Sequence, residues 1–162
     1  MFQVGDKVVH PMHGAGVIDS IVDEKIGGAV QTYYVFRMSA GGLVLKIPVA
    51  NSQVIGLRAV VDAAAADAVI AALGSLEIEV TANWNKRYRE NLERLKSGDL
   101  YEVARVIKCL MSRDAQRGLS NGERKMLHSA KQIFISEMVL AKDVPYSDIE
   151  GQVNACLVGE GA

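Results

Sequence analysis

The hydrophobic pattern of this 162-residue chain changes near residue 60, and this change constrains the fold more than any other feature. Before it, short apolar runs rich in β-branched and aromatic residues are separated by glycines, which is typical of strands and tight turns. After it, apolar residues recur every three to four positions, which is typical of amphipathic helices. The pattern predicts an α+β protein of two domains, a β domain over 1–58 and a compact all-α domain over 59–162.

The β domain is predicted to hold five short strands, at residues 7–10, 17–23, 31–39, 43–48 and 53–57. Gly27-Gly28 and Gly41-Gly42 are expected to form turns at strand ends. Five strands in so short a segment favour a small, strongly bent barrel of the SH3 or Tudor kind. A barrel of this kind leaves at least one edge strand available for pairing with another chain.

The all-α domain is predicted from helical periodicity and from residues that stop and cap helices. Helices are expected over 60–73, 84–96, 100–117, from 121 to the region before Pro145, and over a short segment after Ser147. Side chains that can accept hydrogen bonds from a first helical turn stand at the predicted N-caps, which are Asn83, Asp99, Ser120 and Ser147. Residues 76–80 alternate apolar side chains with glutamate, so this segment is expected to be extended.

Charge is distributed unevenly along the chain. The formal net charge is −1, but residues 81–142 carry thirteen basic and seven acidic side chains, a balance of +6. Residues 1–80 carry a balance of −3 and residues 143–162 a balance of −4. A basic segment between acidic ones favours a polyanionic partner.

The composition excludes several classes of protein. Hydrophobic residues make up 49% of the chain, which is enough for a core and excludes a disordered polypeptide. No window reaches the roughly 18 apolar residues of a membrane span, and the first residues lack the pattern of a signal peptide. The two cysteines, Cys109 and Cys156, are too few for a disulfide framework. We therefore expect a cytoplasmic protein that does not contact a membrane.

No arrangement of residues predicts catalysis or a bound cofactor. His10 and His13 stand close together, but the further ligands that zinc requires are missing nearby. Gly14-Ala15-Gly16 lacks the third glycine and the following helix of a dinucleotide site. The serines lack a nucleophile motif, and the carboxylates are scattered rather than paired. We expect neither enzymatic activity nor a cofactor or metal.

The sole tryptophan lies in the most informative stretch of the chain, residues 83–91. Three basic residues follow Trp84 within five positions, namely Lys86, Arg87 and Arg89. An aromatic ring beside cations suits nucleic acid, because the cations neutralise phosphates while the ring contacts an exposed base. The alternative is that Trp84 begins an apolar stripe with Tyr88 and Leu92 and belongs to the core.

Five segments match the motifs of one known family in the same order, namely Val4–Gly16, Lys46–Pro48, Trp84–Leu92, Leu95–Asp99 and Gly118–Leu127. With these motifs the chain resembles the CarD/CdnL family of bacterial transcription regulators over roughly residues 3–142. The opening motif is also similar to the RNA-polymerase-binding domain of the transcription-repair coupling factor. The segment around Trp84 and the Ser97-Gly98-Asp99 step resemble the stand-alone CarD/CdnL type.

The resemblance implies a Tudor-like N-terminal domain that docks on the β subunit of RNA polymerase by strand-to-strand pairing. Lys46 matches a basic residue that the family uses at this contact. Glu24, with Lys25 beside it, stands where some members of the family have a basic residue. The chain therefore departs from the family pattern at this second docking position.

The resemblance also implies that the helical domain contacts promoter DNA and stabilises the open complex. Trp84 matches the residue that wedges into the minor groove at the upstream edge of the transcription bubble, and the basic residues after it, Lys86, Arg87 and Arg89, match the DNA-contacting set. We expect a monomer, with a domain-swapped dimer as the alternative form. A different hypothesis is a polymerase- or RNA-associated adaptor that has no role in promoter opening.

Overall fold

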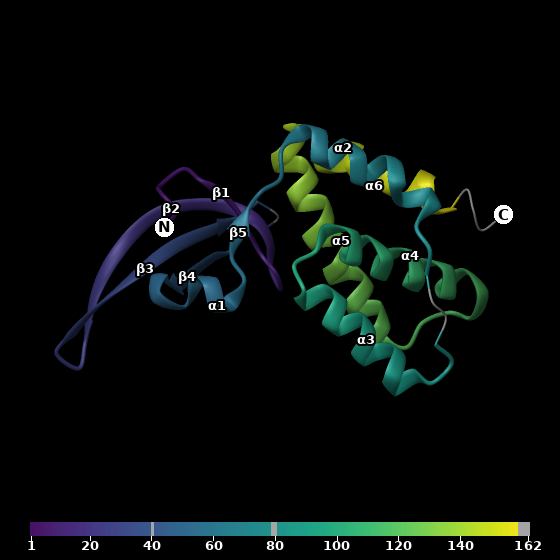
Figure 1. Cartoon of the computed structure of the whole chain (residues 1–162), viewed down its shortest axis with the longest axis horizontal. Helices are drawn as coiled ribbons and strands as arrows, with labels where there is room; N and C mark the ends of the chain where they lie inside the picture. The colour runs from purple at the N-terminus through teal and green to yellow at the C-terminus, as the bar shows by residue number, and fades with distance from the viewer. Residues whose placement is uncertain (40, 79–80, 159–162) are drawn as a thin grey trace.

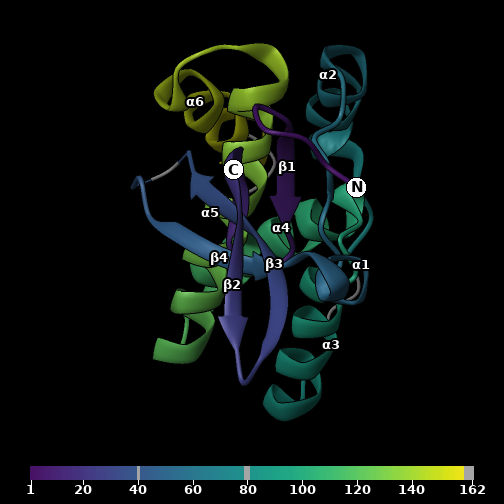
Figure 2. The ribbon, with the colours of Figure 1, turned by 90° about the vertical axis from the view of Figure 1, so that its left-hand side faces the viewer.

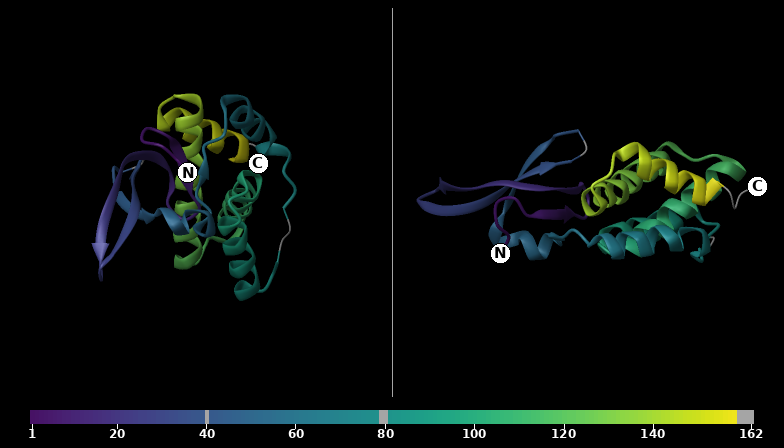
Figure 3. Two further views of the ribbon diagram at one scale, coloured as in Figure 1. Left: turned by 60° about the vertical axis from the view of Figure 1, so that its left-hand side comes forward. Right: turned by 90° about the horizontal axis from the view of Figure 1, so that it is seen from above.

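A computed structural model describes residues 1–39, 41–78 and 81–158 and shows a curved β-sheet beside a bundle of helices (Figure 1). Seen from above, the sheet lies at one end of the molecule and most of the helices lie at the other (Figure 3). The predicted boundary between residues 58 and 59 falls inside the last strand and stays a prediction. We call residues 1–59 the β module and residues 63–158 the helical module.

The β module is a five-stranded antiparallel sheet in the order β4-β3-β2-β1-β5. Its strands are β1 (Lys7–His10), β2 (Gly14–Ile26), β3 (Ala29–Met38), β4 (Val44–Pro48) and β5 (Arg58–Ala59). β2 and β3 form a long hairpin that reaches away from the helices (Figure 1). A shift of register between Ile18 and Ser20 interrupts this pairing, and such a bulge increases the local twist of the sheet.

The sheet does not close into the predicted barrel, because its outer strands β4 and β5 do not pair with each other. The strand predicted over residues 53–57 is also wrong. Ser52–Ile55 form the single helical turn α1, preceded by a 3-10 turn at Val49–Asn51. Gly56 ends this turn with a φ of 96°, a left-handed conformation that glycine adopts without strain. Val54 is 88% exposed, so the apolar run does not mark a buried strand face.

Side chains of β1 to β4, together with Leu57 just before β5, form the core of the β module, which consists of Val8, Ile18, Tyr34, Phe36, Met38, Ile47 and Leu57. Gly16 allows β2 to pass close to β3. A Cβ atom at this position would lie 2.2 Å from the carbonyl oxygen of Arg37 and 2.8 Å from the ring of Phe36. Only glycine fits there.

The helical module contains α2 (Ala63–Ala72), α3 (Trp84–Lys96), α4 (Leu100–Arg117), α5 (Asn121–Lys142) and α6 (Tyr146–Val158), with a 3-10 turn at Leu73–Ser75 after α2. Three predicted N-caps are confirmed, because each side chain accepts a hydrogen bond from an amide of the first turn. These residues are Asn83, Asp99 and Ser120.

Two helices begin at positions other than those predicted. The helix α2 begins at Ala63 rather than at residue 60, because the Asp62 side chain accepts a hydrogen bond from the amide of Ala65. The helix α6 begins at Tyr146, so Ser147 lies inside the helix and is not its N-cap. In the predicted extended segment, residues 76–78 belong to neither a helix nor a strand, and residues 79–80 lie outside the described residues.

Helix α5 is central to the molecule, since it contacts the other helices of the helical module and also the strands β1 and β2. Its side chains Phe134, Ile135 and Met138 are fully buried. Figure 2 looks onto the sheet and shows α5 behind it. Over the residues that the structure describes, no helix has the length and hydrophobicity needed to span a bilayer.

Buried polar contacts on α5 join the two modules. The amide of Ala15 on β2 donates to Ser136 Oγ at 2.9 Å. The next residue, Glu137, is fully buried and accepts two hydrogen bonds at 2.7 Å from the guanidinium of Arg58 on β5. It also accepts one from the amide of Val61 at 3.1 Å. Because both carboxylate oxygens are paired, the buried charge is compensated.

Candidate nucleic-acid interface and docking edge

Trp84 lies at the first position of α3, where the Asn83 side chain caps the helix. The residue is 42% exposed and does not belong to the buried core. Its ring stacks on that of Tyr88, with ring centroids 5.1 Å apart and planes inclined by 19°. Its indole Nε1 donates a hydrogen bond to Ser120 Oγ at 3.1 Å. The stacked rings of Trp84 and Tyr88, which we call the aromatic plate, therefore lie at the N-terminal end of α3. Trp84 is exposed there, as contact with nucleic acid requires.

Two of the three basic residues after Trp84 reach the surface. Lys86 has a side chain that is 68% exposed and lies 3.9 Å from Glu90 Oε1, a surface ion pair that contributes little to stability. Arg89, three residues further on, is also exposed. Both cations can therefore reach a phosphate backbone without the loss of a buried contact.

Arg87 requires a correction to the predicted DNA-contacting set. Its side chain is only 3% exposed, so it cannot reach a phosphate. Its Nε and Nη2 donate to the carboxylate of Glu123 at 2.9 and 3.3 Å, and its Nη1 donates to the carbonyls of Thr81 and Ala82 at 3.0 and 3.2 Å. The guanidinium thus joins the start of α3 to the first turn of α5.

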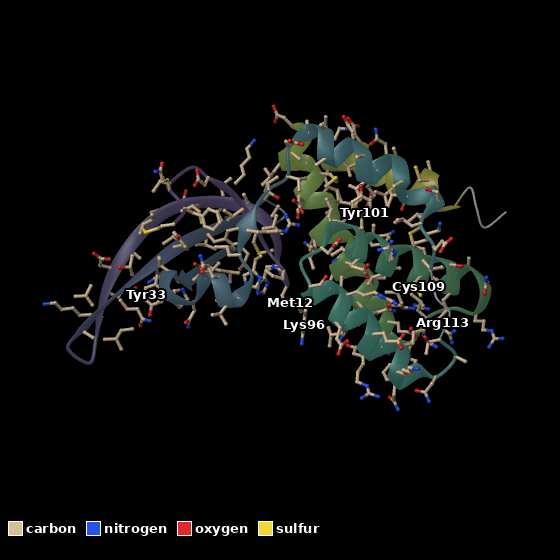
Figure 4. All side chains as sticks on the ribbon, viewed as in Figure 1. Met12, Tyr33, Lys96, Tyr101, Cys109 and Arg113 are labelled. Carbon is tan, nitrogen blue, oxygen red and sulfur yellow. The ribbon has the colours of Figure 1, made fainter. Side chains whose placement is uncertain are left out.

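Glu123, the partner of Arg87, is 2% exposed and ionised. Burial alone would raise its pKa, but hydrogen bonds and charge from Arg87, together with the charge of Arg113 and a bond from Ser120, lower the pKa below its ordinary value. Arg113 lies on α4 with its Nε 3.9 Å from Glu123 Oε1 (Figure 4). The carboxylate therefore keeps its charge and holds three helices together.

The start of α5 adds cations that the sequence analysis missed. Arg124 and Lys125 are exposed there. This turn lies against the aromatic plate, because a Cβ atom added to Gly122 would be 3.7 Å from the Trp84 ring and 3.6 Å from the Tyr88 ring. Arg124 and Lys125 both belong to the matching segment Gly118–Leu127 and to the basic stretch 81–142, but nothing local in the sequence predicts that they lie near Trp84.

The outer edge of β4 is the second candidate surface. None of the strands in the described ranges pairs with this edge, whereas the other outer strand, β5, has two residues only. β5 also contacts the helical module, because Arg58 Nε donates to the carbonyl of Gly98 at 3.0 Å. An open edge offers free backbone groups to a strand of another chain.

The register of β4 defines which backbone groups face outward. The amide of Met38 donates to the carbonyl of Leu43 at 2.8 Å, so these two residues form a hydrogen-bonded pair. Such pairs alternate along an antiparallel ladder, so Leu45 bonds to β3 as well. Val44 and Lys46 therefore direct their N–H and C=O groups toward the open edge. These two residues offer a partner strand alternate donors and acceptors.

The predicted docking residues lie near this edge. Lys46 on β4 forms an ion pair with Glu24 on β2, across the intervening strand β3. Lys25 is exposed but follows Glu24 directly, so its side chain extends from the other face of the strand. Pro48 ends β4 and has no N–H, which limits the donors of the edge to the residues before it.

The two histidines at the turn between β1 and β2 lie side by side. The amide of Met12 donates to His10 Nδ1 at 3.1 Å, and the rings of His10 and His13 lie 4.5 Å apart. Burial and the neighbouring His13 lower the pKa of His10 to about 4, so its imidazole is neutral at pH 7. Within residues 1–39, 41–78 and 81–158, no three side chains group in a way that could hold a metal ion.

The open edge of β4 on one module and the exposed aromatic plate beside cations on the other are two candidate contact surfaces. Family models then identify the class. The model of the CarD C-terminal domain matches residues 68–154, and the model of the CarD-like/TRCF RID domain matches residues 2–61. The chain belongs to the CarD family of transcription regulators, which confirms the resemblance seen in its motifs.

A curated relative covers almost the whole chain. The Bacillus subtilis (strain 168) protein named "Putative transcription factor YdeB" is 33% identical over 150 residues, which are 93% of this chain and 98% of that protein. Both modules therefore occur together in a chain of similar length. A role in the regulation of transcription follows from the family.

Proposed function

We propose that this chain docks on the β subunit of RNA polymerase through the open edge of β4 and stabilises the promoter open complex by placing Trp84 at the upstream edge of the melted DNA. One observation carries the proposal: the sole tryptophan is exposed, stacked and oriented, in a chain of a transcription regulator family. Lys86 and Arg89 supply the contacts with phosphate, and Arg87 serves inside the protein.

The docking step is β-augmentation, in which a polymerase strand pairs with the outward backbone groups of Val44 and Lys46. The match to the CarD-like/TRCF RID domain over residues 2–61 supports this choice of partner. Backbone pairing supplies affinity with little dependence on side chains. The ion pair between Lys46 and Glu24 lies beside the edge and can exchange partners with charged residues of the polymerase.

The stabilising step opposes the re-closure of DNA. At the edge of the bubble an unstacked base can rest on the indole ring, and such contacts contribute about 1–3 kcal/mol per base. That free energy corresponds to a collapse of the bubble that is about 5- to 150-fold slower. The cations add affinity that does not depend on DNA sequence, and docking on the polymerase raises their effective concentration at the promoter.

The lifetime of open complexes under heparin challenge tests this function, measured with cognate RNA polymerase on a ribosomal RNA promoter. We expect the wild-type protein to lengthen the lifetime and Trp84→Ala to lose most of that effect while its binding to the polymerase is unchanged. A Trp84→Ala protein that lengthens the lifetime as the wild type does would contradict the proposal. No lengthening by either protein, with polymerase binding retained, would favour an adaptor without a promoter-opening role.

A further inference from the structure

We propose that Ser120, the N-cap of α5, is a positioning residue that presets the orientation of Trp84. This inference rests on the proposed role of Trp84 at the edge of the bubble. It deepens that role, because it assigns the control of the ring to a residue 36 positions away in the sequence.

The indole N–H of Trp84 is already paired within the protein. Nε1 of Trp84 donates to Ser120 Oγ at 3.1 Å, and Nε1 is the only polar atom of the ring. The indole has therefore no further donor to offer a base. Trp84 acts through ring surface alone, which every base can contact and which carries little sequence preference.

Ser120 is itself held in place by hydrogen bonds. Its Oγ accepts a hydrogen bond from the amide of Glu123 at 3.2 Å and lies 3.4 Å from Glu123 Oε1, to which the hydroxyl can donate. With the indole as its second donor, the hydroxyl has used its hydrogen-bonding capacity. The N-cap of α5 is therefore a fixed acceptor for the ring.

Neighbouring residues of α3 and α5 pack around the Trp84 ring. One face of Trp84 stacks on Tyr88, and a Cβ atom added at Gly122 would lie 3.7 Å from the Trp84 ring and 3.6 Å from the Tyr88 ring. The buried pair of Arg87 and Glu123 holds the first turns of α3 and α5 together beneath them. A ring in such a setting loses little conformational entropy when it meets DNA, which is the advantage of preorganisation.

Intrinsic fluorescence provides a direct test, because the chain has a single tryptophan. The key variant is Ser120→Ala, which removes the acceptor of the indole N–H, and Ser120→Thr is the conservative variant that keeps a hydroxyl. The matched control is Asp99→Ala, which removes the N-cap of α4 without touching Trp84. Both alanine variants lose one N-cap, so a general effect of helix capping on stability appears in both.

Two quantities are measured for each variant. They are the time-resolved fluorescence anisotropy of Trp84 in the free protein and the lifetime of the open complex under heparin challenge. For Ser120→Ala we expect faster local motion of the ring and a lifetime effect reduced about two- to tenfold, the equivalent of one net hydrogen bond. Ser120→Thr should restore both, and Asp99→Ala should leave ring motion unchanged. Unchanged anisotropy in Ser120→Ala, or an equal change in Asp99→Ala, would overturn the inference.

The anisotropy measurement needs no polymerase, so it tests the positioning role of Ser120 separately from the proposed function of Trp84. If Ser120→Ala mobilises the ring but Trp84→Ala leaves the lifetime intact, the positioning holds and the proposed function fails. If Trp84→Ala shortens the lifetime but Ser120→Ala does not mobilise the ring, the proposed function holds and the positioning fails.

Discussion

Two arginines on α3 that are two positions apart have opposite environments. Arg87 is buried against the ionised Glu123, whereas Arg89 is exposed on the adjacent surface. The sequence places both in one basic cluster with Lys86, and nothing local distinguishes them. The distinction arises from the first turn of α5, which brings a carboxylate to one of them only.

We predict that Arg87→Ala destabilises the protein by about 3–5 kcal/mol, because it leaves Glu123 as an uncompensated buried charge. Arg89→Ala is the matched control. It should leave the free energy of unfolding within about 0.5 kcal/mol of wild type and weaken DNA binding in a salt-dependent way. Urea denaturation of both variants measures the stabilities. Equal stabilities of the two variants would contradict the assignment of Arg87 as an interior residue.

The capping residues could be read from the sequence because their action is local. Asn83, Asp99 and Ser120 each bond an amide two or three positions further on, so the pattern and the contact lie in the same short segment. The burial of Arg87 could not be read, since its partner is 36 residues distant. The exposed Arg124 and Lys125 at the start of α5 were missed because their position near Trp84 depends on a contact between segments that are distant in the sequence.

At the scale of elements, one outer strand of the sheet, β4, has an open edge, whereas the other, β5, has two residues only and contacts the helical module. The four longer strands follow from the alternation of apolar residues and from the glycine turns. The predicted barrel and its fifth strand were wrong, because a short apolar run such as residues 53–57 fits a helical turn as well as a strand. Gly56, which ends that turn, resembles an ordinary strand breaker in the sequence.

The open edge leads to a prediction for Val44→Pro. Since the amide of Val44 faces outward, proline removes a donor for the partner strand without breaking a bond to β3. We expect polymerase binding to weaken about tenfold or more. The melting temperature should fall by no more than a few degrees.

Val44→Thr is the matched control for this prediction, because it changes the side chain and keeps the amide. Binding of both variants to the isolated polymerase β subunit can be measured by surface plasmon resonance. Equal affinities for Val44→Pro and Val44→Thr would show that docking does not use this edge.

At the scale of the whole molecule, buried polar contacts fasten the β module to α5. Ser136 and Glu137 lie in an otherwise apolar part of α5, next to Phe134, Ile135 and Met138. Their polarity within this apolar run is the only signal in the sequence that they face a second module. Which strand they meet follows from the chain path, and this is why the junction could not be predicted.

We predict that Glu137→Gln lowers the free energy of unfolding by about 1–3 kcal/mol. The amide cannot replace a carboxylate that accepts two bonds from Arg58 and one from the Val61 amide. Glu150→Gln on the exposed surface of α6 is the matched control and should have no effect. Thermal unfolding by calorimetry measures both, and an unchanged Glu137→Gln protein would show that the junction does not contribute to stability.

The buried contacts of Ser136 and Glu137 hold the two modules together, so the distance between β4 and the Trp84 ring is fixed. Under the proposed function, this distance decides which promoter complexes the protein can contact with both surfaces. The protein fits a promoter only where the melted segment ends at the matching distance from the polymerase surface. Promoters would then be sorted by the geometry of their melted DNA rather than by direct recognition of their bases.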